Sequence, residues 1–259
     1  MQAQTIDEVI EQLDDIILWA QANKSRLGYF AALYRRVTVK VKEGIAANLF
    51  ADGRRMERLD VVFANRYLEA FTAYRSGGET TQSWRVAFDA SHDWSAIVVQ
   101  HLLLGINAHI NLDLGIAAAQ TAPGNAIVGL KEDFDRINRV LASLINTVEQ
   151  ELAKVWPMLK LLDWIAGRTD EAVINFSIDL ARRQAWNVAT QLAPLDPDNA
   201  AHQITEIDTT VSILGHSIQH PGLIVGTVTN CIRLGERHSI PEIISILQQP
   251  TTEKKRHIP

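Results

Sequence analysis

The stretch from Trp94 to Ala119 limits the possible folds more than any other part of the chain. Drawn as a helix, it is apolar on nearly all sides, and a helix of that kind must be covered by other elements in several directions. We therefore predict a buried central helix, at about residues 94–119, which the rest of the chain surrounds.

The segments on either side repeat apolar residues at helical spacing and are separated by short breaks that contain glycine or proline. Val37 to Val41 alternates like a strand, but the helical register there runs longer, so we predict a helix from Leu27 to Ile45. The patterns predict an all-α fold: a single compact multi-helix domain over residues 1–250, followed by a polar, disordered tail at residues 251–259. Further helices are predicted at about residues 6–23, 55–74, 134–155, 169–192, 200–214, 223–234 and 241–248.

The net charge and the cysteine count exclude some binding partners and some kinds of metal site for this protein. A net charge of −5 argues against a nucleic-acid-binding protein, because such proteins usually carry clustered lysine and arginine. Cys231 is the only cysteine, which excludes a cysteine-rich zinc site. The chain shows no signal-peptide pattern and no uncharged apolar run of about 18 residues. We expect a cytoplasmic protein with no transmembrane span and no nucleic-acid partner.

Five polar residues interrupt the apolar central helix: His101, Asn107, His109, Asn111 and Asp113. Leaving a buried polar group without a hydrogen bond costs roughly 1–3 kcal/mol, so these residues need partners or a function. His109 and Asp113 are four residues apart and share one face, so they could bind zinc, iron or manganese together with ligands from other helices. The alternative for this pair is a hydrogen-bonded structural contact.

The other polar residues of the central helix cannot join that pair. His101 lies about 12 Å from His109 along the helix axis, too far to bind the same ion, although it could line a second site or contact a substrate. Asn107 and Asn111 form another four-residue pair on a different face, where they could hydrogen-bond the backbone of a loop.

Asp60 lies beside the apolar stripe of the helix predicted at residues 55–74. Two interpretations are open: a salt bridge with an arginine, either a nearby one such as Arg66 or one on another helix, or a role as a ligand or catalytic carboxylate. In the second case Asp60 completes or orients the His109/Asp113 site, and His101 lines the cavity.

Four phrases of the sequence resemble a bacterial family of uncharacterised helical proteins, a domain of unknown function. They are Tyr29–Thr38, Arg58–Tyr67, His101–Leu114 and Ala181–Trp186, the third of which has the form HLLLGxNAHINxDL. The resemblance spans nearly the whole chain. It implies that Asp60, His101, His109 and Asp113 belong to recurring phrases, and it implies no established activity.

A shorter stretch, Leu104–Asp113, is similar to the metal helix of the zinc-dependent phospholipase C and single-strand nuclease superfamily. The shared pattern is Leu-Gly, a histidine four residues after the glycine and an aspartate four residues after the histidine. The resemblance implies a helical enzyme whose zinc ions activate water for phosphoester hydrolysis. The Pro-x-His element that follows in that superfamily is absent here, where Gly115–Ala117 stands instead.

Three hypotheses follow from the sequence. The first is a metal-dependent, hydrolase-like enzyme that binds its metal through His109 and Asp113. The second is a non-catalytic helical protein that binds an apolar small molecule or a protein partner, with the polar residues of the central helix holding neighbouring helices in register. The third is a metal-independent enzyme of secondary metabolism with an apolar substrate in the helical cavity.

Overall fold

The computed structural model describes residues 2–137 and 177–248, and within these ranges every regular element is a helix. The predicted all-α class is confirmed for this part of the chain, which contains no strand. Residues 127–137 are also helical. The elements, in chain order, are α1 (Ile6–Ala22), α2 (Gly28–Ala46), α3 (Gly53–Arg75), α4 (Gln82–Asp89), η1 (Ala90–His92), α5 (Val98–Ile106), η2 (Asn107–Asp113), α6 (Leu114–Thr121), η3 (Gly124–Ala126), α10 (Ile178–Leu192), α11 (Pro197–Gln219), α12 (Leu223–Gly235) and α13 (Ile240–Gln248).

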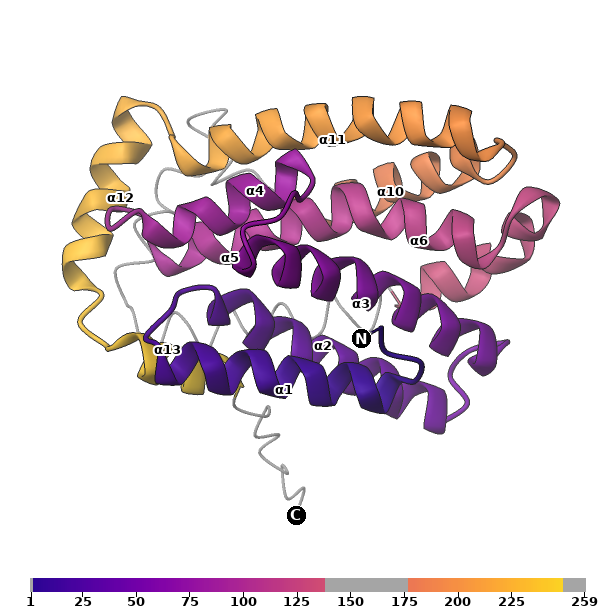
Figure 1. Ribbon diagram of the computed structural model, residues 1–259, viewed down its shortest axis with the longest axis horizontal. Helices are drawn as coiled ribbons and strands as arrows, with labels where there is room; N and C mark the ends of the chain where they lie inside the picture. The colour runs from indigo at the N-terminus through magenta and orange to yellow at the C-terminus, as the bar shows by residue number, and fades with distance from the viewer. Residues whose placement is uncertain (1, 138–176, 249–259) are drawn as a thin grey trace, which may run out of the picture.

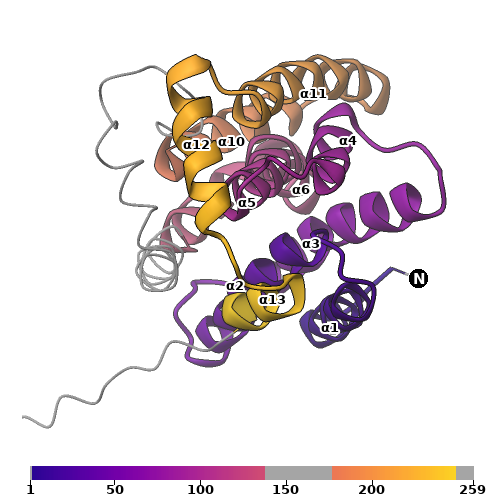
Figure 2. The same ribbon diagram turned by 90° about the vertical axis from the view of Figure 1, so that its left-hand side faces the viewer.

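The described helices lie in tiers around one continuous run, α5–η2–α6 (Figure 1). On one side of this run lie α1, α2, α3 and α13, and on the other side lie α10 and α11. Figure 2 shows α12 crossing one end of the molecule, from the tier of α11 to that of α13. The run is covered from both tiers, as predicted for the central helix.

The central helix begins at Val98, four residues later than predicted. Ile97 has an extended backbone, and its N–H donates to the Gln100 side chain at 3.1 Å, which closes the first turn. Within the described residues, Val98–Thr121 is long and apolar enough to cross a membrane, but 78% of its most apolar window is buried inside the protein.

Two glycines of the central run let neighbouring helices approach closely. A Cβ atom at Gly105 would lie 2.4 Å from the ring of Phe30 on α2, and one at Gly115 would lie 2.6 Å from the Val188 side chain on α10. Both distances are far below van der Waals contact, so any larger residue would push these helices apart. Glycine in mid-helix usually marks such an approach.

Some predicted boundaries differ from the structure. The helix predicted at 169–192 begins, in its described part, at Ile178, because the Ser177 side chain caps it by accepting from the Leu180 N–H. Pro197 occupies the first turn of α11, which is longer than predicted. Most of the helix predicted at 134–155 and the whole tail at 251–259 lie outside the described residues.

Candidate functional site

The seven residues from Asn107 to Asp113 form a π-helical segment, η2, in the middle of the central run. At its end the Leu114 N–H bonds to the His109 carbonyl, five residues back. Short π segments inside α-helices are rare and often occur at functional sites. This segment contains four of the five polar residues that stand out in the sequence.

Asp113 is buried and joins three helical elements. The Arg66 Nε of α3 donates to one carboxylate oxygen at 2.7 Å, and the Trp84 Nε1 of α4 donates to the other at 2.8 Å. Burial alone would raise the pKa of Asp113, but the Arg66 charge, with His109 and Trp84, holds that pKa below its usual range. Asp113 is therefore an ionised carboxylate that ties η2 to α3 and α4.

His109 contacts the same carboxylate and is surrounded by aromatic rings. Its Nδ1 lies 3.5 Å from Asp113 Oδ2, a long hydrogen bond, and its ring stacks on Phe63 with centroids 3.6 Å apart. The Tyr34 ring meets it edge-on at 4.4 Å. Burial lowers the pKa of His109, so the imidazole is neutral at pH 7. Because Asp113 favours a proton on Nδ1, Nε2 is an acceptor, and no described residue donates to it.

Three more buried oxygens have no hydrogen-bond partner among the described residues: the hydroxyls of Tyr34 and Tyr67, whose rings contact His109, and Oδ2 of Asp60, whose charge would act on Tyr34. Arg66 pairs with Asp113, so it is not the arginine partner that the sequence suggested for Asp60. Burial, with the nearby Glu57 charge, raises the pKa of Asp60 to about 8. The carboxyl group is therefore protonated at neutral pH and can donate a hydrogen bond.

His101 belongs to a different cluster. Its ring lies edge-on to Tyr29 at 5.6 Å, and burial, with the charge of Arg26, lowers its pKa to about 3. Its Nε2 also lacks a partner in the described part of the chain, and the residue lines a cavity of about 20 Å³. That volume holds about one water molecule. Phe30 lines this cavity and lies 5.6 Å from the His109 ring.

The described residues around His109 do not include a complete set of metal ligands. Among the described residues no group of three or more His, Cys, Asp or Glu side chains could hold one. Both oxygens of Asp113 already accept hydrogen bonds, and the adjacent Arg66 charge would repel a cation. Metal binding by His109 and Asp113 therefore stays a prediction from the sequence.

The opposite face of η2 contacts α11. The Asn107 side-chain N–H donates to the Val211 carbonyl at 2.9 Å, and the Asn111 N–H donates to the Asn107 oxygen at 2.8 Å. The predicted partner was a loop, whereas Val211 lies within a helix. Gly215 of α11 faces the same region: a Cβ there would lie 3.2 Å from the Val86 side chain of α4 and 3.5 Å, an ordinary van der Waals contact, from the Asn107 amide nitrogen.

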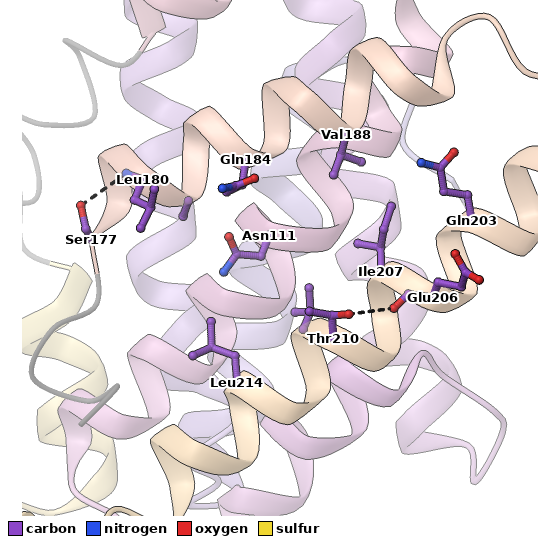
Figure 3. Close-up of a pocket in the computed structure, with 12 residues that line it drawn as sticks. Asn111, Ser177, Leu180, Gln184, Val188, Gln203, Glu206, Ile207, Thr210 and Leu214 are labelled. Atoms are coloured by element: carbon purple, nitrogen blue, oxygen red, sulfur yellow. Dashed lines mark hydrogen bonds between the residues drawn. The ribbon is translucent and has the colours of Figure 1, made fainter. Parts of the chain in front are cut away.

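A groove of about 580 Å³ opens beside Asn111, between α10 and α11 (Figure 3). In Figure 3 the Asn111 amide projects from the central helix into this space, below Gln184 of α10. Half of the twelve lining side chains are aliphatic, and the other half are polar: three amides, two hydroxyls and one carboxylate. The groove is lined by Asn111, Ser177, Leu180, Ala181, Gln184, Val188, Gln203, Glu206, Ile207, Thr210, Val211 and Leu214.

Comparison with known proteins assigns the chain to a family. The model of the family of unknown function DUF5995 matches residues 6–221. The chain belongs to this family. No curated protein and no solved structure matches it. We call His109, Asp113 and the side chains that contact them, Arg66, Trp84 and Phe63, the buried polar centre. The DUF5995 match includes this centre and the groove, and it ends just before α12.

Several functional candidates of this DUF5995 protein were not identified from the sequence. The sequence indicates Arg66 only as a partner for Asp60, and it indicates Trp84 only as an apolar anchor in the polar segment from Thr80 to Asp93. A buried indole N–H needs an acceptor, so Trp84 could have been expected to donate to a buried polar residue. No sequence pattern indicated the groove, because the apolar pattern of α10 and α11 does not reveal that the two helices leave a space between them.

Proposed function

We propose that this DUF5995 protein binds a small, largely apolar molecule in the groove between α10, α11 and η2. The observation that supports this is the groove's volume of about 580 Å³ together with its lining. Ligand sites typically enclose about 300–1,000 Å³ and combine apolar walls with a few polar groups. This is the ligand-binding alternative among the functions expected from the sequence.

The lining defines the chemistry of the ligand. Asn111 uses one of its two side-chain N–H groups on Asn107, which leaves its amide oxygen to accept from a hydroxyl or amide donor of the ligand. Glu206 is the one charged side chain among the described residues that line the groove, and it disfavours an anion. We therefore infer an uncharged ligand with an aliphatic or aromatic body and one or two hydrogen-bonding groups that face Asn111.

The contacts of η2 with α3, α4 and α11 hold the part of the central helix that borders the groove in position. Asp113 ties η2 to α3 and α4, and Asn107 ties it to α11, so these contacts fix the position of Asn111. In this proposal the polar residues of the central helix hold neighbouring helices in place and support a binding site. Such support from surrounding side chains is a general requirement of a precise site.

Titration with the neutral fluorophore Nile red tests the proposal. Thr210 lines the groove and its hydroxyl donates to the Glu206 carbonyl. Thr205, on the same helix, makes the equivalent bond to Ala201 but lies outside the groove. Thr210→Trp fills the groove and should weaken binding about tenfold or more, equal to ~1.4 kcal/mol. Thr205→Trp should leave binding unchanged.

Equal affinity in both tryptophan variants would place the dye elsewhere and contradict the proposal. A circular-dichroism spectrum of each variant shows whether the helices are intact, so weaker binding is read only from folded protein. Wild-type protein that does not bind the dye at all would also contradict it.

A second candidate function, metal-independent proton transfer, is favoured by the free Nε2 of His109. A neutral imidazole oriented by a carboxylate is a suitable general base. The rings of Tyr34 and Tyr67 lie 4.4 and 6.3 Å from the imidazole, centre to centre, and their hydroxyls are further donors on these neighbouring side chains. Phe63 covers the imidazole face, so a substrate must displace this ring to reach His109. The metal-dependent hydrolase hypothesis would need further ligands and has no support from the described side chains.

A further inference from the structure

Arg182 of α10 is a buried cation that forms no ion pair with any described residue. The side chain is 2% exposed, and its Nε and Nη2 have no hydrogen-bond partner among the described residues. The guanidinium carbon lies 5.2 Å from the centre of the Phe134 ring. Two carboxylates, Asp135 and Asp179, act on it electrostatically, but neither forms a described ion pair with it. Asp135 pairs instead with Lys131.

The two unused nitrogens are the pair that matters for anion recognition. Nε and Nη2 point in the same direction and can bind both oxygens of a carboxylate or phosphate at once. Arg35 makes this contact elsewhere in the chain: its Nε and Nη2 donate to the two oxygens of Asp14 at 2.5 and 2.9 Å. Arg182 has the same pair of donors, and no described residue supplies the acceptor.

Such an arrangement is unfavourable unless something binds there. Removing a charge from water without a partner carries a large desolvation penalty, and burial lowers the pKa of Arg182 to about 9. The Phe134 ring offsets part of this penalty by a cation–π contact but does not accept the N–H bonds. The side chain therefore needs an oxyanion.

We propose that Arg182 is the anchor of an anion site that binds the carboxylate or phosphate group of a small molecule. The site is separate from the groove. Ala181 and Gln184 of α10 line the groove, whereas Arg182 does not and contacts Phe134 instead. It goes beyond the proposed binding of an uncharged molecule, and each site can be tested without the other.

Thermal unfolding in the presence of simple anions tests this site. Inorganic phosphate and acetate are the probes, with chloride at the same ionic strength as the reference. The wild-type melting temperature should rise by about 4 °C at an anion concentration about ten times its dissociation constant. A response to phosphate alone identifies a phosphate site, and a response to acetate as well identifies a general oxyanion site.

Two arginine variants assign the response. Arg182→Gln should abolish it, whereas Arg35→Gln, which removes an arginine already paired with Asp14, should retain it. If Arg182→Gln does not fold, Arg182→Lys keeps the charge but loses the paired donors, and should show a weaker response. No response in the wild type, or an equal response in Arg182→Gln or Arg182→Lys, would overturn the proposal.

The remaining explanation is that an aspartate of the chain pairs with Arg182 in solution. In that case the Asp135→Asn/Asp179→Asn double variant would gain an anion response that the wild type lacks, which would also overturn the proposal. The proposal instead predicts that wild type and double variant both respond.

Discussion

Asp113→Asn is the substitution that tests the buried polar centre most directly. The asparagine has nearly the same shape, but it removes the charge and replaces one accepting oxygen with an NH₂ group. That group then faces either Arg66 Nε or Trp84 Nε1, both of which are donors. One hydrogen bond is lost, and two donors are forced together.

The size of the effect follows from these contacts. A hydrogen bond to a charged group contributes about 1.5–3 kcal/mol, and breaking a buried ion pair costs about 3–5 kcal/mol. The Arg66 side chain is 23% exposed, so water can solvate part of the charge left behind, and the lower end applies. We expect a loss of about 3 kcal/mol in the free energy of unfolding, or a fall of about 8 °C in melting temperature.

Urea unfolding followed by tryptophan fluorescence measures this loss. Asp14→Asn is the matched control, because Asp14 accepts the same kind of paired contact from Arg35 at a more exposed position. Exposed pairs contribute about 1 kcal/mol or less, so the control should change little. If Asp113→Asn were as stable as Asp14→Asn, then Asp113 would not hold η2 to α3 and α4, and the argument that these contacts hold the border of the groove in position would fail.

Two further predictions concern protonation and metal content. The pKa of Asp60 is raised to about 8 in the folded protein, against about 3.9 in the unfolded chain. The folded protein therefore binds the proton more tightly than the unfolded chain does. The resulting stabilisation of the folded state is complete below about pH 4 and is lost as the pH rises to about 8. Asp60→Asn should flatten this part of the stability curve in urea titrations at several pH values; an unchanged slope would mean that Asp60 is ionised in the folded state. Protein purified without added metal should contain well under about one equivalent of zinc, iron or manganese by elemental analysis, because tight sites need three or more protein ligands. A stoichiometric metal that His109→Ala removes would refute this expectation and support the hydrolase hypothesis.

The sequence predicted the location of the polar centre better than its contacts. Four-residue spacing placed His109 and Asp113 on one face and Asn107 with Asn111 on another, and the structure has both pairs. The π segment was not predicted, because seven residues with one wider turn keep nearly the same apolar pattern as an α-helix. Partners distant in sequence were not predicted either. Which arginine reaches Asp113 depends on how α3 packs against the central run, and no local pattern of the chain contains that information.

The arrangement of η2 connects the two faces of the central helix. His109 and Asp113 face the aromatic side chains of α2, α3 and α4, while Asn107 and Asn111 face α11 and the groove, all within one seven-residue segment. Because interiors are close-packed, η2 cannot shift on one face without disturbing its contacts on the other. A ligand that shifts Asn111 when it binds would therefore also change the distances between Asp113 and its partners on α3 and α4. The buried centre and the groove are parts of one unit, although only the first is evident from the sequence.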